Sequence, residues 1–250
     1  MKKIVFFLIM TLFYSVSCFA GKRFTLVTVD FPPYYGENLP EQGWVSEVVR
    51  TALESQGYEV EIKFMSWVKA VADTKQGYYD ALLGAYRTPE RADLYYFSVP
   101  IAQARTGFFK RKEVDISFKE LDELKGYKIG VVKGYATSKE FDLSDSLNKI
   151  EVQNLDDGLI KLKNREIDLM ADSRAVGKYH LKLLEKKKPG IGQEIEFIMP
   201  VLAMNKLYVA VSKKTTNAYR KLIDFNQGLR KIYMNGSFRK IKAKHKKHIQ

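Results

Sequence analysis

Residues 60–85, VEIKFMSWVKAVADTKQGYYDALLGA, decide the fold of this chain. A strand-like run is followed by a helical pattern of about ten residues, and the segment ends in an apolar run that opens on Asp80. Residues 150–172, IEVQNLDDGLIKLKNREIDLMAD, repeat this order, and their final run opens on Asp168. One strand–helix–strand unit in each half predicts two α/β lobes of similar design, not one large sheet.

The chain from residue 24 onward continues this alternation of short strands and amphipathic helices. Apolar runs and helical spacing predict, in chain order, a strand at 24–31, a helix at 45–53, strands at 127–132 and 207–212, and a helix at 216–234. In the helix after Ser66 we expect Val68, Val71 and Ala72 to be buried, and the Ser66 hydroxyl to cap the first turn. This alternation indicates parallel sheets with right-handed crossovers.

The first twenty residues have the pattern of a secretory signal peptide. Lys2 and Lys3 precede an apolar stretch at 4–13, and small residues leading to Ala20 offer a cleavage site. The apolar stretch is too short to span a bilayer. We therefore interpret residues 1–20 as a signal peptide and expect a periplasmic mature protein.

The single cysteine of the chain, Cys18, lies inside the predicted signal peptide. Cleavage before Gly21 removes it, so we expect a mature chain without thiol or disulfide. A chain of this length can bury enough surface to be stable without one. Lipidation of Cys18 is the alternative, but Ser15 stands three residues before it, where a lipoprotein signal carries an aliphatic residue.

The formal net charge of the whole chain is +13, from 42 basic and 29 acidic residues. Such an excess occurs in proteins that bind nucleic acids or anionic surfaces. The lysines are dispersed, however, with dense runs only at 186–188 and 240–247, and no nucleic-acid-binding motif accompanies them. We therefore expect no nucleic-acid partner. His180, His245 and His248 are too scattered for a metal site, so we expect neither a metal nor a cofactor.

Three predicted strand ends carry side chains suited to ligand binding, at residues 30–35, 84–91 and 171–174. Ligands of open α/β sheets bind at the carboxyl ends of strands, where backbone N–H groups are free. The fork of Arg91 suits a carboxylate and the carboxylate of Asp172 suits an ammonium, which together would bind a zwitterion. Phe31, Trp67 and Tyr86 would supply aromatic walls. Alternatively, Arg91 forms a surface salt bridge with Glu90 or Asp93.

A series of short motifs extends over nearly the whole mature chain. They are, in order, SW at 66–67, DALLG at 80–84, TPER at 88–91, FSVP at 97–100, LKGYKIGV at 124–131, DLMAD at 168–172 and MNGSF at 234–238. This ordered series resembles the polar-amino-acid class of bacterial extracellular solute-binding proteins. The number of motifs in order makes the resemblance specific for family and fold, and less specific for the ligand.

The resemblance implies an α/β, two-lobed periplasmic-binding-protein fold of type 2, in which two hinge strands cross between the lobes. Lobe 1 is expected to hold residues 22–106 together with 206–250, and lobe 2 residues 110–200. Residues 105–111 have the extended pattern expected of one crossing segment.

The resemblance also implies roles for individual residues. Arg91 would hold the ligand carboxylate, Asp172 its ammonium, and Phe31 and Trp67 its side chain. Backbone groups would come from Gly84 and from a turn of the second lobe that contains Gly134, Ala136 and Thr137. Three features depart from the family pattern. Tyr86 stands where a small hydroxyl residue is usual, Ala136 replaces a common glycine, and residues 43–47, GWVSE, lack the usual acidic residue two positions after the aromatic.

Together these features predict a binding protein that closes around a small amino-acid-like ligand and delivers it to an inner-membrane ABC permease. We expect the protein to be a monomer. We also expect no catalytic residues, because no serine nucleophile motif is present and no cysteine survives maturation. One alternative is a periplasmic dehydratase of the same fold, with Asp172 or Glu90 as the general acid. Another is a ligand sensor that has no transporter of its own.

Overall fold

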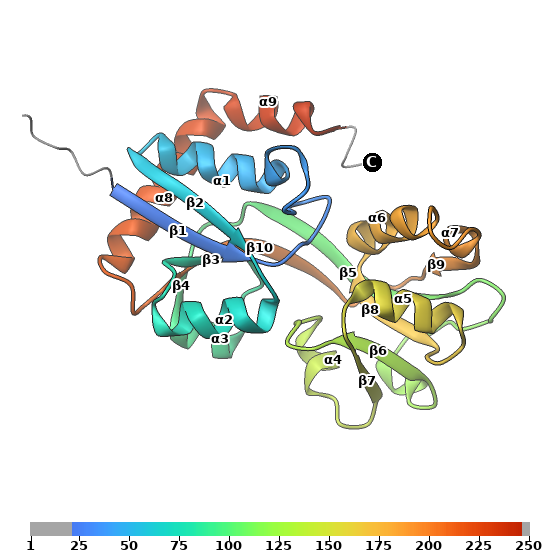
Figure 1. The fold of residues 1–250 in the computed structure, drawn as a ribbon. Helices are drawn as coiled ribbons and strands as arrows, with labels where there is room; N and C mark the ends of the chain where they lie inside the picture. Colours follow the sequence, from blue (N-terminus) through green and yellow to red (C-terminus); the bar gives the residue numbers. More distant parts are fainter. Residues whose placement is uncertain (1–21, 247–250) are drawn as a thin grey trace, which may run out of the picture.

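The computed structural model describes residues 22–246 as two α/β lobes that are joined by two long strands (Figure 1). These strands, β5 (Ala102–Arg111) and β10 (Ala203–Ser212), pair with each other in antiparallel orientation as they pass between the lobes. The predicted two-lobed fold with two crossing strands is confirmed. The predicted signal peptide, its cleavage site and Cys18 lie outside the described residues.

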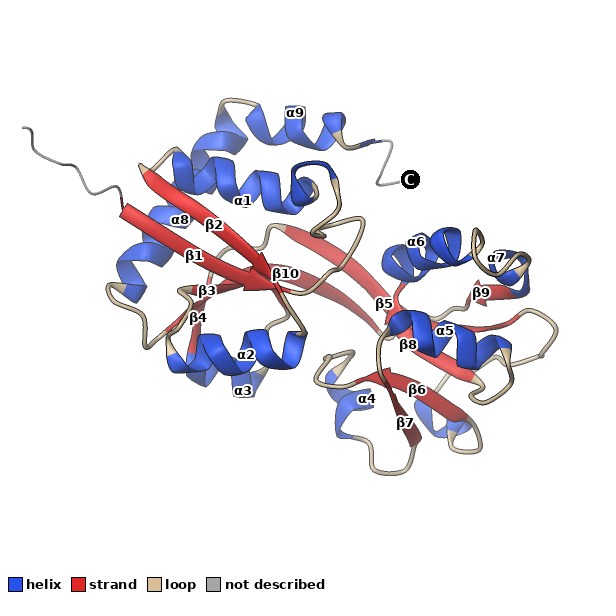
Figure 2. Cartoon of the chain, in the orientation of Figure 1, coloured by secondary structure: helices blue, strands red, loops and turns tan. Residues whose placement is uncertain are grey.

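The first lobe contains both ends of the described chain. Its strands are β1 (Lys22–Thr28), β2 (Tyr58–Phe64), β3 (Ala81–Ala85) and β4 (Tyr95–Phe97). Its helices are η1 (Pro40–Gln42), α1 (Trp44–Glu54), α2 (Trp67–Gln76), α3 (Pro89–Leu94), α8 (Ala218–Met234) and α9 (Ser237–Lys244). In Figure 2 α1, α8 and α9 lie on one side of the sheet and α2 and α3 on the other.

The second lobe is formed by the central part of the chain. Its strands are β6 (Lys128–Val132), β7 (Asn148–Val152), β8 (Leu169–Ser173) and β9 (Ile195–Phe197). Its helices are η2 (Leu121–Leu124), α4 (Lys139–Leu143), α5 (Leu155–Lys163), α6 (Arg174–Leu184) and α7 (Ile191–Glu194). The strands and helices of the repeated unit occur in the predicted order in both lobes, and their ends differ from the predicted ones by one to three residues.

Hydrogen bonding is continuous between the lobes, which differs from the prediction. Residues 203–207 of β10 pair with β5, whereas residues 208–212 of the same strand pair with β3 and β4. The strands follow the order β2-β1-β3-β10-β5-β8-β6-β7 in one sheet. The prediction of two lobes without one large sheet was wrong in this respect, because the crossing strands extend the ladder of each lobe into the other.

Helix α1 buries the predicted apolar face, which includes Val45, Val48 and Leu53. Helix α2 does not: Val68 is 49% exposed, and the buried residues of this helix are Trp67, Ala70 and Thr74. Ser66 stands at the N-cap, but its side chain makes no cap hydrogen bond. The rotation of α2 follows from the tryptophan, since burial of an indole removes more apolar surface from water than burial of a valine.

Strand β1 ends at Thr28, three residues before its predicted end. Phe31 leaves the sheet and forms an isolated bridge with Tyr35, in a turn that contains Pro32 and Pro33. Proline has no N–H for a strand ladder, so the pairing cannot continue through this turn. The turn places the Phe31 side chain at the edge of the sheet, where the two lobes meet.

Candidate ligand-binding site

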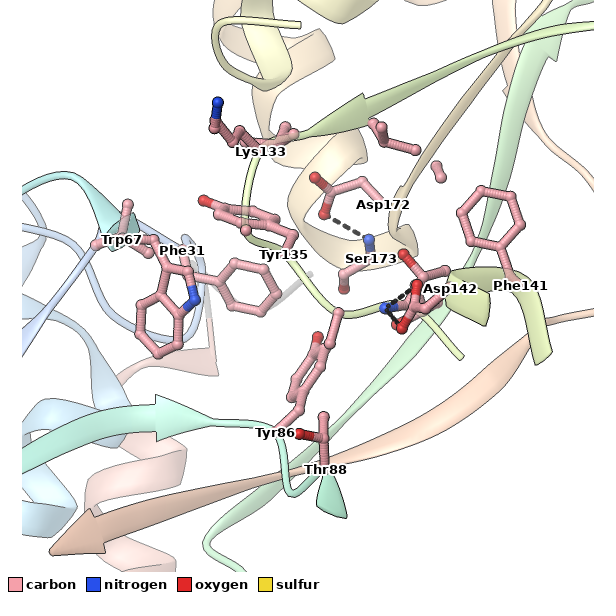
Figure 3. Close-up of a pocket in the computed structure, with 18 of the residues that line it drawn as sticks. Phe31, Trp67, Tyr86, Thr88, Lys133, Tyr135, Phe141, Asp142, Asp172 and Ser173 are labelled. Atoms are coloured by element: carbon pink, nitrogen blue, oxygen red, sulfur yellow. Dashed lines mark hydrogen bonds between the residues drawn. The ribbon is translucent and has the colours of Figure 1, made fainter. Parts of the chain in front are cut away.

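A cavity of about 480 Å³ lies between the two lobes (Figure 3). Its walls come from the segments that follow β1, β2, β3 and β6, from the end of β8, and from residues of β5, β7 and α4. All nine residues singled out from the sequence line it: Phe31, Trp67, Gly84, Tyr86, Arg91, Gly134, Ala136, Thr137 and Asp172. The structure therefore brings these residues together at the carboxyl ends of parallel strands, where α/β folds bind ligands.

Arg91 is held by the short helix α3. The Thr88 hydroxyl accepts a hydrogen bond from the Arg91 backbone N–H at 3.3 Å, which caps the helix. The guanidinium carbon lies 5.3 Å from the ring centroid of Trp67, a cation–π contact. In the described part of the chain, Arg91 has no ion pair within 4 Å, so the alternative of a salt bridge with Glu90 or Asp93 is not observed.

The Arg91 guanidinium contacts both lobes. Its Nη1 donates to the carbonyl of Tyr86 at 3.1 Å, and its Nη2 donates to the carbonyl of Gly134 at 3.3 Å. Burial lowers the pKa of Arg91 below its ordinary value, although an arginine remains charged in proteins. A guanidinium has five N–H donors, so these two bonds leave donors for a ligand carboxylate.

Asp172 is a buried acid with an open hydrogen-bonding position. It is 5% exposed, and its Oδ1 accepts a hydrogen bond from the Ser173 backbone N–H at 2.5 Å. No residue within 22–246 supplies a partner for its Oδ2. Burial raises the pKa of Asp172 to about 7, against the opposing effects of the Ser173 N–H and of His180. A cationic ligand group would supply the missing partner and stabilise the ionised form.

The aromatic wall is ordered by contacts among its own rings. Phe31 stacks against Tyr35 with 5.5 Å between centroids, and meets Tyr86 edge to face at 6.4 Å. Gly84 makes this packing possible, because a Cβ at that position would overlap the Tyr35 hydroxyl group. Gly84 also has a φ of +81°, which disfavours other residues.

In the turn at residues 134–137 of the second lobe, one of the expected N–H donors already has a partner within the protein. The backbone N–H of Thr137 already donates to both carboxylate oxygens of Asp142, at 3.1 and 3.0 Å. The Thr137 carbonyl accepts from Asn205 Nδ2 at 2.7 Å, which anchors the turn to hinge strand β10. The expected donor at Thr137 is therefore occupied by a protein carboxylate. Gly134 and Ala136 remain predicted sources of N–H donors.

Several residues of the cavity were not selected from the sequence, among them Asp142, Tyr35 and Tyr135. Asp142 lies in helix α4 and Tyr35 follows the two prolines; both line the cavity. Tyr135 extends from the second lobe and packs against the apolar cluster of the first lobe that includes Trp67. Tyr35 and Tyr135 stand within segments that the sequence had already singled out. Nothing in the spacing around Asp142 distinguishes it from a solvated helix residue.

The two described histidines have structural partners. His180 Nδ1 lies 2.6 Å from Asp156, and His245 Nε2 lies 2.6 Å from Glu47. His248 lies outside the described residues. Residues 22–246 contain no group of three or more His, Cys, Asp or Glu side chains placed to hold a metal ion. The same part of the chain has no helix that is both long and apolar enough to cross a membrane.

Two α/β lobes, two crossing strands and an inter-lobe cavity with an arginine and a buried aspartate define a two-lobed ligand-binding protein of the periplasmic type. The sequence matches the profile of the bacterial extracellular solute-binding proteins, family 3, over residues 25–248. Because this match covers most of the chain, the protein belongs to that family.

Relatives and solved structures agree with this assignment. The chain is similar to the "Probable amino-acid-binding protein YxeM" of Bacillus subtilis (strain 168), with 22% identity over 86% of this chain and 80% of the relative. An ancestral arginine-binding protein bound to arginine matches with a TM-score of 0.73 and 24% identity, over 89% of this chain and 97% of that one. A histidine kinase sensor domain with similarity to periplasmic binding proteins matches with a TM-score of 0.76 and 21% identity, over 90% and 96%.

Proposed function

We propose that this protein binds a small amino-acid-like ligand that carries a carboxylate and a cationic nitrogen, in the cavity between its lobes. The observation that carries the proposal is the buried Asp172, whose Oδ2 has no partner within residues 22–246, in the same cavity as the Arg91 guanidinium. A buried carboxylate without a partner is costly, and a bound cation removes that cost. The similarity to a probable amino-acid-binding protein supports this ligand class.

The role proposed for each residue follows from its position in the wall of the cavity. Arg91 holds the ligand carboxylate with its remaining N–H donors, and Asp172 holds the cationic nitrogen. Phe31 and Trp67 pack against the apolar part of the ligand. The backbones of Gly84, Gly134, Ala136 and the adjacent turn contribute hydrogen bonds, while Tyr86 and Thr137 complete the wall.

The proposed mechanism is closure of the lobes about β5 and β10, with lobe 1 at residues 22–106 and 206–250 and lobe 2 at 110–200. Arg91 belongs to the first lobe and Asp172 to the second, so a ligand that contacts both favours the closed state. In this proposal a monomer works in the periplasm and presents the closed form to an ABC permease, and the ligand is released unchanged.

A second candidate is a sensory role, which the similarity to a histidine kinase sensor domain favours. In that case the closed form would be detected by a receptor instead of a permease. Both candidates require the same ligand binding and the same closure. A transport assay with radiolabelled ligand in cells that lack only this protein distinguishes them, because loss of uptake occurs only in the transport case.

The binding proposal is tested by thermal unfolding in the presence of each standard amino acid, followed by calorimetry on those that stabilise the protein. A ligand that binds only the folded state raises the melting temperature in a saturable way. We expect saturable stabilisation by at least one zwitterionic compound, recovered unchanged by mass spectrometry. Absence of any stabilisation at millimolar concentrations would contradict the proposal. Conversion of the compound would instead favour the dehydratase alternative.

A further inference from the structure

The space beside Asp172 is bounded by aromatic rings that come from both lobes. Phe31 and Tyr86 belong to the first lobe and Tyr135 to the second, and in Figure 3 the three rings lie around the space that Asp172 and Ser173 border. The Phe31 and Tyr86 rings meet edge to face, with 82° between their planes, and we call Phe31, Tyr86 and Tyr135 the aromatic box. Trp67 is not a member of this box, because its ring contacts the Arg91 guanidinium, 5.3 Å from the ring centroid.

The tyrosine walls are close to the carboxylate and remain neutral. Burial raises the pKa of both the Tyr86 and the Tyr135 hydroxyls, and in each case the negative charge of Asp172 adds to the increase. A neutral aromatic ring has a negative π face that attracts a cation. The box therefore combines aromatic faces with one buried carboxylate.

Besides the hydroxyl groups of Tyr86 and Tyr135, the box contains few polar side-chain atoms. Within residues 22–246, the buried side-chain atoms of the cavity that have no partner are Asp172 Oδ2 and Ser173 Oγ. A primary ammonium carries three N–H donors, each of which loses a water partner on entering the cavity. An alkylated nitrogen carries fewer donors and gains contact between its alkyl groups and the rings, in the manner of aromatic cages that bind quaternary ammonium groups.

We propose that this site selects an alkylated ammonium over a primary one: Phe31, Tyr86 and Tyr135 enclose the N-alkyl groups, and Asp172 balances the charge. This inference rests on the proposed function, since the same Arg91 would hold the carboxylate of the ligand. It narrows the ligand class to N-methylated amino acids, cyclic secondary amino acids and betaines.

The test is a calorimetric titration with glycine, N-methylglycine, N,N-dimethylglycine and N,N,N-trimethylglycine, four probes that share one carboxylate and differ only in methylation. The affinity is expected to rise along the series, with a gain on the order of tenfold from glycine to the most favoured methylated member. An affinity that falls with methylation would overturn the inference.

Two substitutions of Tyr86 test whether its aromatic ring causes the preference for methylated probes. Tyr86→Phe keeps the ring and removes the hydroxyl, so the methylated probes should keep their advantage. Tyr86→Ser removes the ring and adds a small acceptor, so the advantage should shrink or reverse. A methylation preference that is identical in Tyr86→Ser and the parent protein would overturn the role of the box.

The outcomes separate this inference from the proposed function. Binding of primary amino acids with weaker binding of all methylated probes overturns the inference and leaves the proposed function intact. If neither the standard amino acids nor the methylated series bind, both fail together. Loss of binding for every member of the series in Arg91→Ala, with the preference retained in Tyr86→Phe, supports both.

Discussion

Arg91 combines three restraints that fix its guanidinium at the boundary between the lobes: the Thr88 cap, the Trp67 ring, and carbonyls from both lobes. An arginine that is held in this way binds a carboxylate through two parallel hydrogen bonds. Lysine has a single ammonium and cannot reproduce the fork. The side chain is therefore expected to carry more of the affinity than any other in the cavity.

We predict that Arg91→Ala weakens ligand binding by roughly 2–5 kcal/mol, because it leaves a ligand carboxylate without its partner. Arg91→Lys should also weaken binding substantially. Calorimetry with the tightest ligand of the amino-acid screen measures both effects. Arg87→Ala is the control, since Arg87 is exposed and does not line the cavity. Parent-like binding by Arg91→Ala together with loss of binding in Arg87→Ala would contradict the assignment.

Asp172 makes the stability of the ligand-free protein depend on pH. Its pKa is raised from the ordinary 3.8 to about 7 in the folded protein, so between these values the folded state holds a proton that the unfolded chain releases. The free energy of unfolding therefore falls as the pH rises through this window. Above pH 7 the folded state bears the cost of a buried, ionised carboxylate.

We predict that Asp172→Asn raises the melting temperature of the ligand-free protein at pH 8, with a smaller increase at pH 5. Thermal unfolding across this pH range measures the difference between variant and parent. Asp145→Asn is the control. Because Asp145 is exposed, the melting temperature of this variant should follow that of the parent protein. A lower melting temperature for Asp172→Asn at pH 8 would show that the carboxylate has a stabilising partner.

At the residue scale, sequence reasoning placed all nine predicted residues at one cavity. Most of them stand at or near a predicted strand end or helix start, and strand ends of one sheet converge. Gly134, Ala136 and Thr137 were chosen from the family resemblance. Sequence reasoning failed for Asp142, which takes the N–H of Thr137. That contact depends on how α4 turns back on the preceding loop, and no local spacing encodes it.

At the scale of elements, the periodicity of α1 predicted its buried face and that of α2 did not. In α1 the apolar residues form one stripe, so only one orientation buries them. In α2 the apolar residues lie on two sides, and the burial of Trp67 decides the orientation. The pairing of β10 with strands of both lobes was not predictable either, because a strand's partners depend on the whole sheet.

Helices α1 and α8 approach closely at a glycine. A Cβ on Gly228 would overlap the backbone carbonyl of Ala52 in α1, and a backbone atom cannot move aside as a side chain can. We predict that Gly228→Ala destabilises the protein by about 1–3 kcal/mol, the usual cost of overpacking. Urea unfolding measures the effect. Gly126→Ala is the control, since no atom lies within 4 Å of its added Cβ. Equal midpoints for the two variants would contradict this packing.

At the scale of the whole molecule, the proposed mechanism has the lobes rotate as units about the two crossing strands, so that Arg91 and Asp172 approach each other. We predict that a ligand from the amino-acid screen decreases the radius of gyration, because the proposed contacts are divided between the lobes. Small-angle X-ray scattering with and without the ligand measures this change. Arg91→Ala should show no decrease at the same ligand concentration. An unchanged radius for the parent protein with saturating ligand would indicate a site within one lobe.

The most direct test of the central claim is mass spectrometry of small molecules released by denaturing the protein after native purification. The cavity is expected to release a compound with one carboxylate and one cationic nitrogen, in near-stoichiometric amount from the parent protein and in much smaller amount from Arg91→Ala. Dialysis of the parent before denaturation is the control for weakly held solutes. Release of equal amounts of the same compound from the parent and from Arg91→Ala, or of a compound that lacks a carboxylate, would contradict the claim.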